Sequence, residues 1–141
     1  MKYTGSGALA SAIAMNKFLT KKHVAKEKIK TAVHTIVRKG EDIAKRAAEL
    51  FRSFPQPSVV KPATSGSSLG VSIVRTYAEI EQALHEALKH SDTAIIEEFI
   101  TGKEATCGVI DNFRGEKHYA LPPVEIRKPE ASPFFDYKAK Y

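Results

Sequence analysis

The feature that most constrains this chain is a loop of glycine and serine that separates two short runs rich in β-branched residues. The runs, Ser58–Lys61 and Val71–Val74, predict two strands with the loop between them. Gly66 and Gly70 in this loop can adopt backbone conformations that are closed to other residues. Because consecutive N–H groups in such a loop form a concave anion site, the pattern predicts a flap over a nucleotide.

The polar side chains of the loop suit a polyphosphate. Ser67 and Ser68 add hydroxyl donors, and Lys61 adds a positive charge where the first strand ends. The loop does not follow the G-x-x-x-x-G-K-[ST] pattern, because no lysine follows its glycines and a strand, rather than a helix, is expected next. A plain flexible turn is the alternative that composition leaves open.

The composition is that of one soluble globular domain. A hydrophobic content of 43% over 141 residues supports a packed core and argues against disorder. The net charge of +6 fits binding of phosphates, nucleic acid or an acidic surface. The single cysteine, Cys107, excludes an internal disulfide and favours a cytoplasmic location, and we expect it as a small core residue of a strand. No apolar run approaches the roughly 20 residues of a membrane span, so no membrane partner is expected.

Hydrophobic periodicity predicts a mixed fold of the α+β or α/β class. We expect helices over residues 8–14, 16–28 and 41–54, and a further helix that begins with a capping box at residues 76–79. We expect strands over residues 31–37, 58–61, 71–74 and 93–99. The turn at residues 112–115 predicts a hairpin that pairs Glu104–Ile110 with Lys117–Leu121.

Two further groups of charged residues could complete a nucleotide site. Lys17 could converge with Lys61 on a phosphate, although a plain surface lysine is the commoner interpretation. The segment from Glu97 to Ile100, followed by Glu104, places carboxylates where they could accept hydrogen bonds from a ribose or an exocyclic amine. A solvated acidic strand end is the alternative.

Two other patterns point away from metal and nucleic-acid binding. The five histidines and the single cysteine show no metal-ligand spacing, so no metal site is expected among them. A run of five lysines could bind RNA, but no aromatic residues interleave for base stacking, which favours a solvated helix face. The run consists of Lys21, Lys22, Lys26, Lys28 and Lys30.

Together these motifs resemble the D-alanine–D-alanine ligases of the ATP-grasp superfamily. The resemblance rests on residues 3–7, 14–17, 60–62, 66–71, 97–100, 102–104, 121–126 and 135–141. It implies an ATP-grasp central subdomain with an antiparallel sheet and flanking helices, followed by the first strands of the C-terminal subdomain. The family forms an acyl phosphate on one D-alanine, which the amine of a second D-alanine attacks, to make a peptidoglycan precursor.

The resemblance also assigns roles to individual residues. It implies that ATP contacts Lys17, Lys61, Gly66, Ser67, Ser68, Gly70, Glu97, Glu98, Phe99, Ile100, Glu104 and Lys140. It implies catalytic roles for Ser67, Lys140 and Tyr141, which close the serine loop against the omega loop. Mg2+ is expected with ATP, on ligands outside this chain. The family further implies homodimers and no nucleic-acid partner.

Three positions depart from the family pattern. Asn16 stands where aspartate is usual, which exchanges one helix cap for another. Ser65 replaces a usual acidic residue, which removes a charge near the serine loop, and Lys138 replaces a usual glutamate in the omega loop.

The resemblance covers only part of the family's domain plan. We expect residues 1–15 to be a remnant of an inter-domain helix, 16–99 the central subdomain, and 100–141 the start of the C-terminal subdomain, truncated in the omega loop. The chain alone is therefore expected not to make a dipeptide. The alternatives are a nucleotide-binding fragment, another ATP-grasp carboxylate–amine ligase, and a basic nucleic-acid-binding domain.

Overall fold

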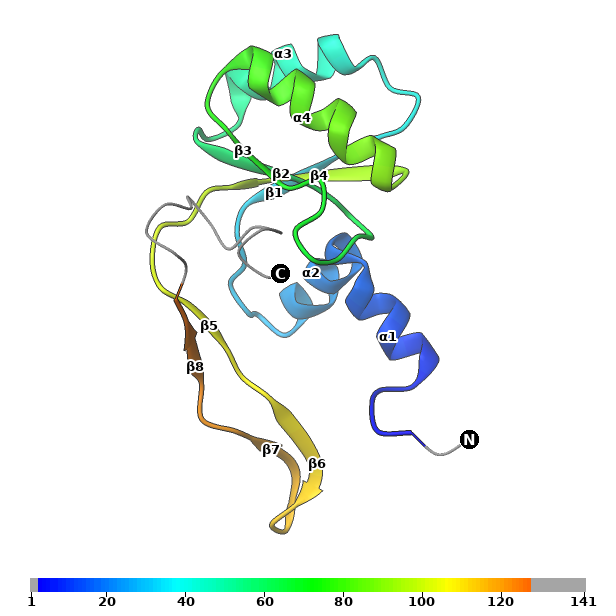
Figure 1. Cartoon of the computed structure of the whole chain (residues 1–141), viewed down its shortest axis with the longest axis vertical. Coiled ribbons are helices and arrows are strands. Elements are labelled where there is room, and N and C mark those ends of the chain that lie inside the picture. Colours follow the sequence, from blue (N-terminus) through cyan, green and yellow to red (C-terminus); the bar gives the residue numbers. More distant parts are fainter. Residues whose placement is uncertain (1–2, 128–141) are drawn as a thin grey trace. The chain divides into compact units, whose positions relative to one another are not determined.

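The computed structural model describes residues 3–127, which divide into two compact units, residues 3–100 and 101–127 (Figure 1). The first unit contains α1 (Ala8–Met15), α2 (Lys17–Lys26), β1 (His34–Arg38), α3 (Ile43–Ser53), β2 (Ser58–Pro62), β3 (Ser72–Val74), α4 (Tyr77–His90) and β4 (Thr93–Glu98). The second unit contains β5 (Glu104–Thr106), β6 (Val109–Phe113), β7 (Glu116–Ala120) and β8 (Val124–Ile126). The mixture of helices and antiparallel strands confirms the expected fold class.

A four-stranded antiparallel sheet organises the first unit, with strand order β1-β4-β2-β3. Figure 1 shows α3 and α4 on one side of this sheet and α2 on the other. Because side chains alternate along a strand, Val37, Val60 and Ile96 point to the α3–α4 side and join the buried core. Lys61 and Glu97 occupy the alternate positions of their strands, which places them on the side of α2.

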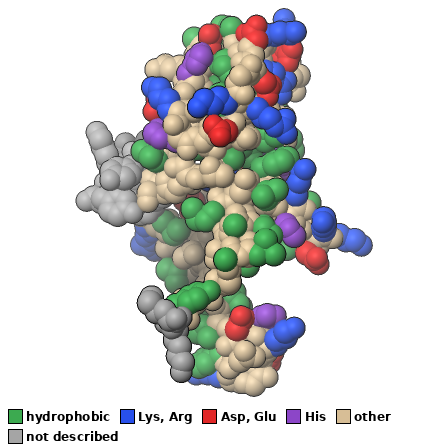
Figure 2. Space-filling model, turned by 90° about the vertical axis from the view of Figure 1, so that its right-hand side faces the viewer, with side chains coloured by type: hydrophobic (Ala, Val, Ile, Leu, Met, Phe, Trp, Pro, Cys, Tyr) green, Lys and Arg blue, Asp and Glu red, His purple; other side chains and the backbone are tan. Residues whose placement is uncertain are grey.

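Apolar helix faces and well-capped helix ends build the α3–α4 layer. Leu50 of α3 packs with Ile80 and Leu84 of α4 in the core, and full burial of such a side chain contributes about 1.5–3 kcal/mol. The capping box predicted for α4 is present, with Thr76 accepting from the Glu79 N–H and the Glu79 carboxylate accepting from the Thr76 N–H. Lysines, arginines and carboxylates intersperse over the upper part of the molecule, where Figure 1 places these helices (Figure 2).

The expected helices and strands of the first unit are all present, with boundaries that differ by a few residues. The strand expected from residue 31 begins at His34. The residue before it, Val33, donates a hydrogen bond to the Glu98 side chain and accepts one from the Glu98 N–H. The helix expected to reach residue 28 ends at Lys26, before Lys28 takes a left-handed φ of 58°.

The second unit corrects the expected hairpin. β6 pairs with β7, but β5 ends at Thr106 and pairs with β8, so the single strand expected over Glu104–Ile110 is wrong. The two strand pairs separate where Gly108 interrupts one side of the hairpin and Pro122–Pro123 interrupt the other. Glycine and proline both disfavour the interior of a paired strand. Cys107 lies at this break. Its thiol is exposed and donates to the Leu121 carbonyl at 3.0 Å, so the expectation of a core cysteine is also wrong.

Candidate functional site

The start of α2 is anchored to the end of β2. The Asn16 side chain accepts a hydrogen bond from the Leu19 N–H at 3.1 Å and caps the helix, as expected for an asparagine at this position. The Lys17 N–H donates to the Ala63 carbonyl at 2.9 Å. These bonds hold the first residue of α2, Lys17, beside the segment that opens the glycine–serine loop.

Lys17 extends its ammonium group onto that same segment. Nζ donates to the Pro62 carbonyl at 3.0 Å and to the Ser65 carbonyl at 2.5 Å. The amine is half-buried, and this burial lowers its pKa below the ordinary lysine range. The positive charge of Lys61 lowers the pKa further, while the negative charge of Glu97 opposes the shift.

Lys61 and Glu97 form an ion pair on adjacent strands. The Lys61 Nζ lies 2.6 Å from Glu97 Oε2, and the carboxylate is almost completely buried. On its other side, Glu97 Oε1 lies 3.2 Å from the ammonium of Lys21. Two ammonium groups therefore pair with a single carboxylate on the α2 side of the sheet, and a third, that of Lys17, lies near enough to interact with its charge. The excess of positive charge at a partly buried position favours an anionic ligand.

The loop that follows β2 has an unusual backbone. Ser67 and Ser68 both adopt left-handed conformations, with φ values of 50° and 59°. Of the two loop glycines, Gly70 has a positive φ and Gly66 does not. Backbone strain of the kind that the two serines show is often found at ligand-binding loops.

Gly70 ends the loop in a close contact. Its φ is +68°, and a Cβ placed on it would lie 2.8 Å from the His90 ring and 2.9 Å from Pro62 Cγ. Only glycine satisfies both the dihedral angle and the contact distances. Gly70 therefore holds the loop against β2 and the end of α4.

The acidic segment at the end of β4 is also fixed by hydrogen bonds. The Val33 N–H donates to the Glu98 carboxylate at 2.9 Å, and the Glu98 N–H donates to the Val33 carbonyl at 3.0 Å. The Phe99 N–H donates to the Pro57 carbonyl at 3.1 Å. Ile100 follows with its side chain exposed. This exit from the sheet continues directly from Glu97.

The first unit thus brings together most of the residues predicted to bind ATP. Lys17 and Lys61 converge, and the residues of the loop and of the β4 end belong to the same unit. Glu104 begins β5 in the second unit, with an exposed side chain. Lys138, Lys140 and Tyr141 lie outside the described residues.

Lys21 is the residue that sequence reasoning assigned wrongly. Its side chain is only 14% exposed and pairs with Glu97, whereas the run of lysines was expected to be a solvated helix face. Lys22, Lys26, Lys28 and Lys30 are exposed, as that interpretation predicts. The signal that could have separated Lys21 is its spacing of four residues from Lys17, which places both on one face of α2.

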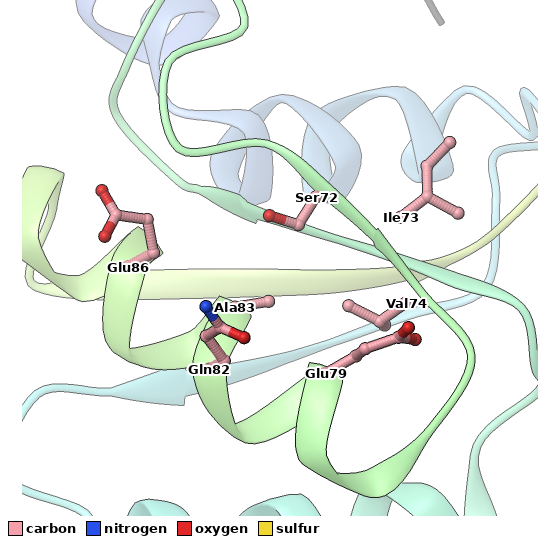
Figure 3. A pocket seen from close by; sticks show the side chains of 7 residues that line it. All are labelled: Ser72, Ile73, Val74, Glu79, Gln82, Ala83 and Glu86. Carbon is pink, nitrogen blue, oxygen red and sulfur yellow. The ribbon is translucent and has the colours of Figure 1, made fainter. Parts of the chain in front are cut away.

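A hollow of about 270 Å³ between β3 and α4 contains none of the predicted residues. Figure 3 shows Gln82 between two carboxylates of α4, those of Glu79 and Glu86. Glu79 already accepts two backbone N–H bonds, and Glu86 pairs with Lys89 and His90. Because both carboxylates are already hydrogen-bonded or ion-paired, the group of Lys17, Lys21 and Lys61 is the better candidate site.

Residues 3–127 contain no cluster of three or more His, Cys, Asp or Glu side chains able to hold a metal ion. Over the same residues, every helix is too short or too polar to cross a membrane.

The fold is similar to the ATP-grasp domains of solved D-alanine–D-alanine ligases. The D-alanyl-alanine synthetase A of Vibrio cholerae superposes with a TM-score of 0.79 at 26% identity, over 91% of this chain and 38% of that one. The D-alanine–D-alanine ligase of Helicobacter pylori gives a TM-score of 0.70 at 30% identity, over 92% of this chain and 39% of that one.

Sequence comparison identifies the family. The family model described as D-ala D-ala ligase C-terminus matches residues 24–141, and the chain belongs to this family. The D-alanine–D-alanine ligase of Geobacter sulfurreducens is 40% identical over 139 residues, which are 99% of this chain and 40% of that protein. That of Pediococcus pentosaceus is 38% identical over 100% of this chain and 36% of its own length. The chain thus spans about two-fifths of the curated relatives that it matches.

Proposed function

We propose that this chain is the ATP-binding part of a D-alanine–D-alanine ligase. The observation that carries the proposal is the convergence of Lys17 and Lys61 beside the loop that contains Ser67 and Ser68. Two ammonium groups and a loop of unusual backbone conformation suit the phosphates of a nucleotide. The names of the relatives supply the ligase chemistry.

In the proposed reaction, the γ-phosphoryl group of ATP passes to a carboxylate oxygen of the first D-alanine and ADP leaves. The amine of the second D-alanine then attacks the acyl carbon, and inorganic phosphate leaves as the peptide bond forms. Lys17 and Lys61 would neutralise negative charge on the phosphates, and Ser67 would donate to the γ-phosphate. The product would serve peptidoglycan synthesis.

The end of β4 is proposed to bind the base. Glu97 begins this segment, and its buried carboxylate is held by the ammonium groups of Lys61 and Lys21. The backbone of Glu98 and Ile100 and the side chain of Phe99 would line the pocket for the base. The role of Glu104 on the ribose, and those of Lys140 and Tyr141, rest on the family resemblance alone.

The remaining parts of the proposal also rest on the family. Residues 16–99 would be the central ATP-grasp subdomain and residues 100–141 the start of the next, in a cytoplasmic, homodimeric enzyme without nucleic-acid partners. Mg2+ would accompany ATP. The described residues do not form a site for this ion, so no step of the proposed reaction is assigned to it.

Calorimetric titration of the 141-residue chain with ATP tests the assignment. Lys61→Ala removes a charge-assisted phosphate contact and should cost about 1.5–3 kcal/mol of binding free energy. Lys39→Ala is the matched control, because Lys39 is a largely exposed lysine that pairs with exposed Asp92. Equal affinities for the two variants would contradict the assignment.

A second assay separates ligase chemistry from nucleotide binding alone. D-alanine-dependent phosphate release above the level of Lys61→Ala would demonstrate ligase chemistry in this chain, and ATP binding without such release would support a purely nucleotide-binding role. RNA binding that weakens with salt and ignores ATP would favour the nucleic-acid alternative.

A further inference from the structure

Lys21 is held inside the site, whereas the lysines that follow it in the run are exposed. It lies one turn after Lys17 on α2, and its ammonium is 3.2 Å from Glu97 Oε1. The same ammonium lies 3.4 Å from the Ala32 carbonyl, in the segment that leads into β1. Lys21 therefore connects α2, β4 and the entry to β1.

The carboxylate of Glu97 has a different cation on each oxygen. Oε2 pairs with Lys61 at 2.6 Å, and Oε1 faces Lys21 at 3.2 Å. A carboxylate that is more than nine-tenths buried requires such compensation, since a buried charge without a partner is strongly unfavourable. The two cations together determine which way the carboxylate plane is turned.

The orientation of Glu97 decides what Lys61 can offer to a ligand. An ammonium has three N–H donors, and the observed pairing uses a single carboxylate oxygen. If both oxygens turned toward Lys61, the amine would be drawn against the sheet. Lys21 prevents this by keeping Oε1 on its own side.

We propose that Lys21 is a positioning residue of the nucleotide site, which holds Glu97 so that Lys61 faces the phosphates. This inference rests on the nucleotide role proposed above for Lys61. Lys21 itself touches no part of the proposed nucleotide and acts through Glu97.

The test compares three variants of the full chain by calorimetric titration with ATP. Lys21→Met should weaken ATP binding about tenfold. This corresponds to about 1.4 kcal/mol, which lies within the range of coupling energies between residues in contact. Lys21→Arg should restore most of the affinity by returning a cation to Oε1. Lys26→Met is the matched control, an exposed lysine on the same helix, and should bind as the parent does.

A double-mutant cycle distinguishes positioning from a general loss of structure. If Lys21 acts through Lys61, the double variant Lys21→Met/Lys61→Met should bind ATP no more weakly than Lys61→Met alone. Additive losses would overturn the proposal, as would a Lys21→Met variant that binds like Lys26→Met. Melting temperatures within a few degrees of the parent would show that the variants are folded.

A nucleotide-free measurement separates this inference from the proposed function. The acetylation rate of Lys61, followed by peptide mass spectrometry at fixed pH, should fall in Lys21→Met and stay unchanged in Lys26→Met, because the released carboxylate would engage the Lys61 amine more fully. A parent chain that binds no ATP but shows this difference would refute the nucleotide assignment and leave the positioning intact. An unchanged Lys61 rate in Lys21→Met would refute the positioning.

Discussion

The two units of this chain use the same kind of antiparallel strand with opposite results. β4 lies between two other strands, and the strand buries four consecutive residues, from Ala94 to Glu97. Within residues 3–127, β6 pairs with β7 alone, and all five of its residues are exposed. Among residues 101–127 none is buried. Backbone pairing alone therefore does not make a core, and a second layer of side chains is required.

In the second unit, side-chain contacts around the β6–β7 turn provide local stabilisation. The guanidinium of Arg114 lies 5.4 Å from the ring of Phe113 and 5.7 Å from that of Tyr119, which pack edge to face. Contacts of this kind contribute about 0.5–1 kcal/mol at exposed positions. They stabilise a turn, whereas the α3–α4 layer stabilises the whole first unit.

Amide hydrogen exchange should show the largest difference between the two units. The amides of β4 should exchange only through global unfolding, while those of β6 and β7 open locally, so we expect protection free energies to differ by about 5 kcal/mol or more. Exchange read by NMR on the intact chain measures both at once. Equal protection in β4 and β6 would show that the exposed hairpin is stabilised by something other than the contacts described.

Truncation of a single side chain should destabilise the protein much more in the first unit than in the second. Leu84→Ala removes a fully buried side chain from α4 and should lower the free energy of unfolding by about 2–5 kcal/mol. Val109→Ala on exposed β6 should change it by no more than about 0.5 kcal/mol. Urea unfolding followed by circular dichroism gives both values, and similar losses would contradict the division into a packed and an unpacked region.

Loss of the α4 cap should have a smaller effect. Thr76→Ala leaves the Glu79 N–H without its side-chain acceptor and should cost about 1 kcal/mol of unfolding free energy. Thr76→Ser keeps the hydroxyl and serves as the control, with a change of a few tenths at most. If alanine and serine behave alike in urea unfolding, the cap does not stabilise the helix.

The smallest expected effect is a pH dependence at the same cap. N–H bonds from Arg75 and Thr76 hold the pKa of Glu79 below its ordinary range. A lowered pKa means that this stabilisation is complete above the unfolded-state pKa and is lost as the pH falls through the folded-state pKa. Glu79→Gln should therefore flatten the acid side of a stability–pH curve measured by thermal melting, while Glu116→Gln in the second unit should leave it unchanged.

The helices of the first unit could be predicted from the sequence because their capping and periodicity signals lie within a few consecutive residues. The Thr76–Glu79 capping box and the apolar spacing of α3 need no knowledge of distant residues. The role of Lys21 could not be predicted in this way, since it depends on which face of α2 covers Glu97, about 75 residues later in the chain. The split of the expected hairpin likewise depended on Gly108 and the two prolines meeting at one level of the ladder.

The sequence predicted where the glycine–serine loop lies, but not the backbone conformation that it adopts. Its location between β2 and β3 and the nearby Lys61 followed from the sequence. The left-handed backbone of Ser67 and Ser68 did not, because these residues rarely adopt it without tertiary support.

The contact of Gly70 with His90 and Pro62 has a consequence for protein engineering. The loop is short and its sequence is simple, which would make it an attractive phosphate-binding element to graft onto another scaffold. Its last residue, however, fits only against the final residue of α4 and the proline that ends β2. A graft would therefore have to carry the helix end and the strand end along with the loop.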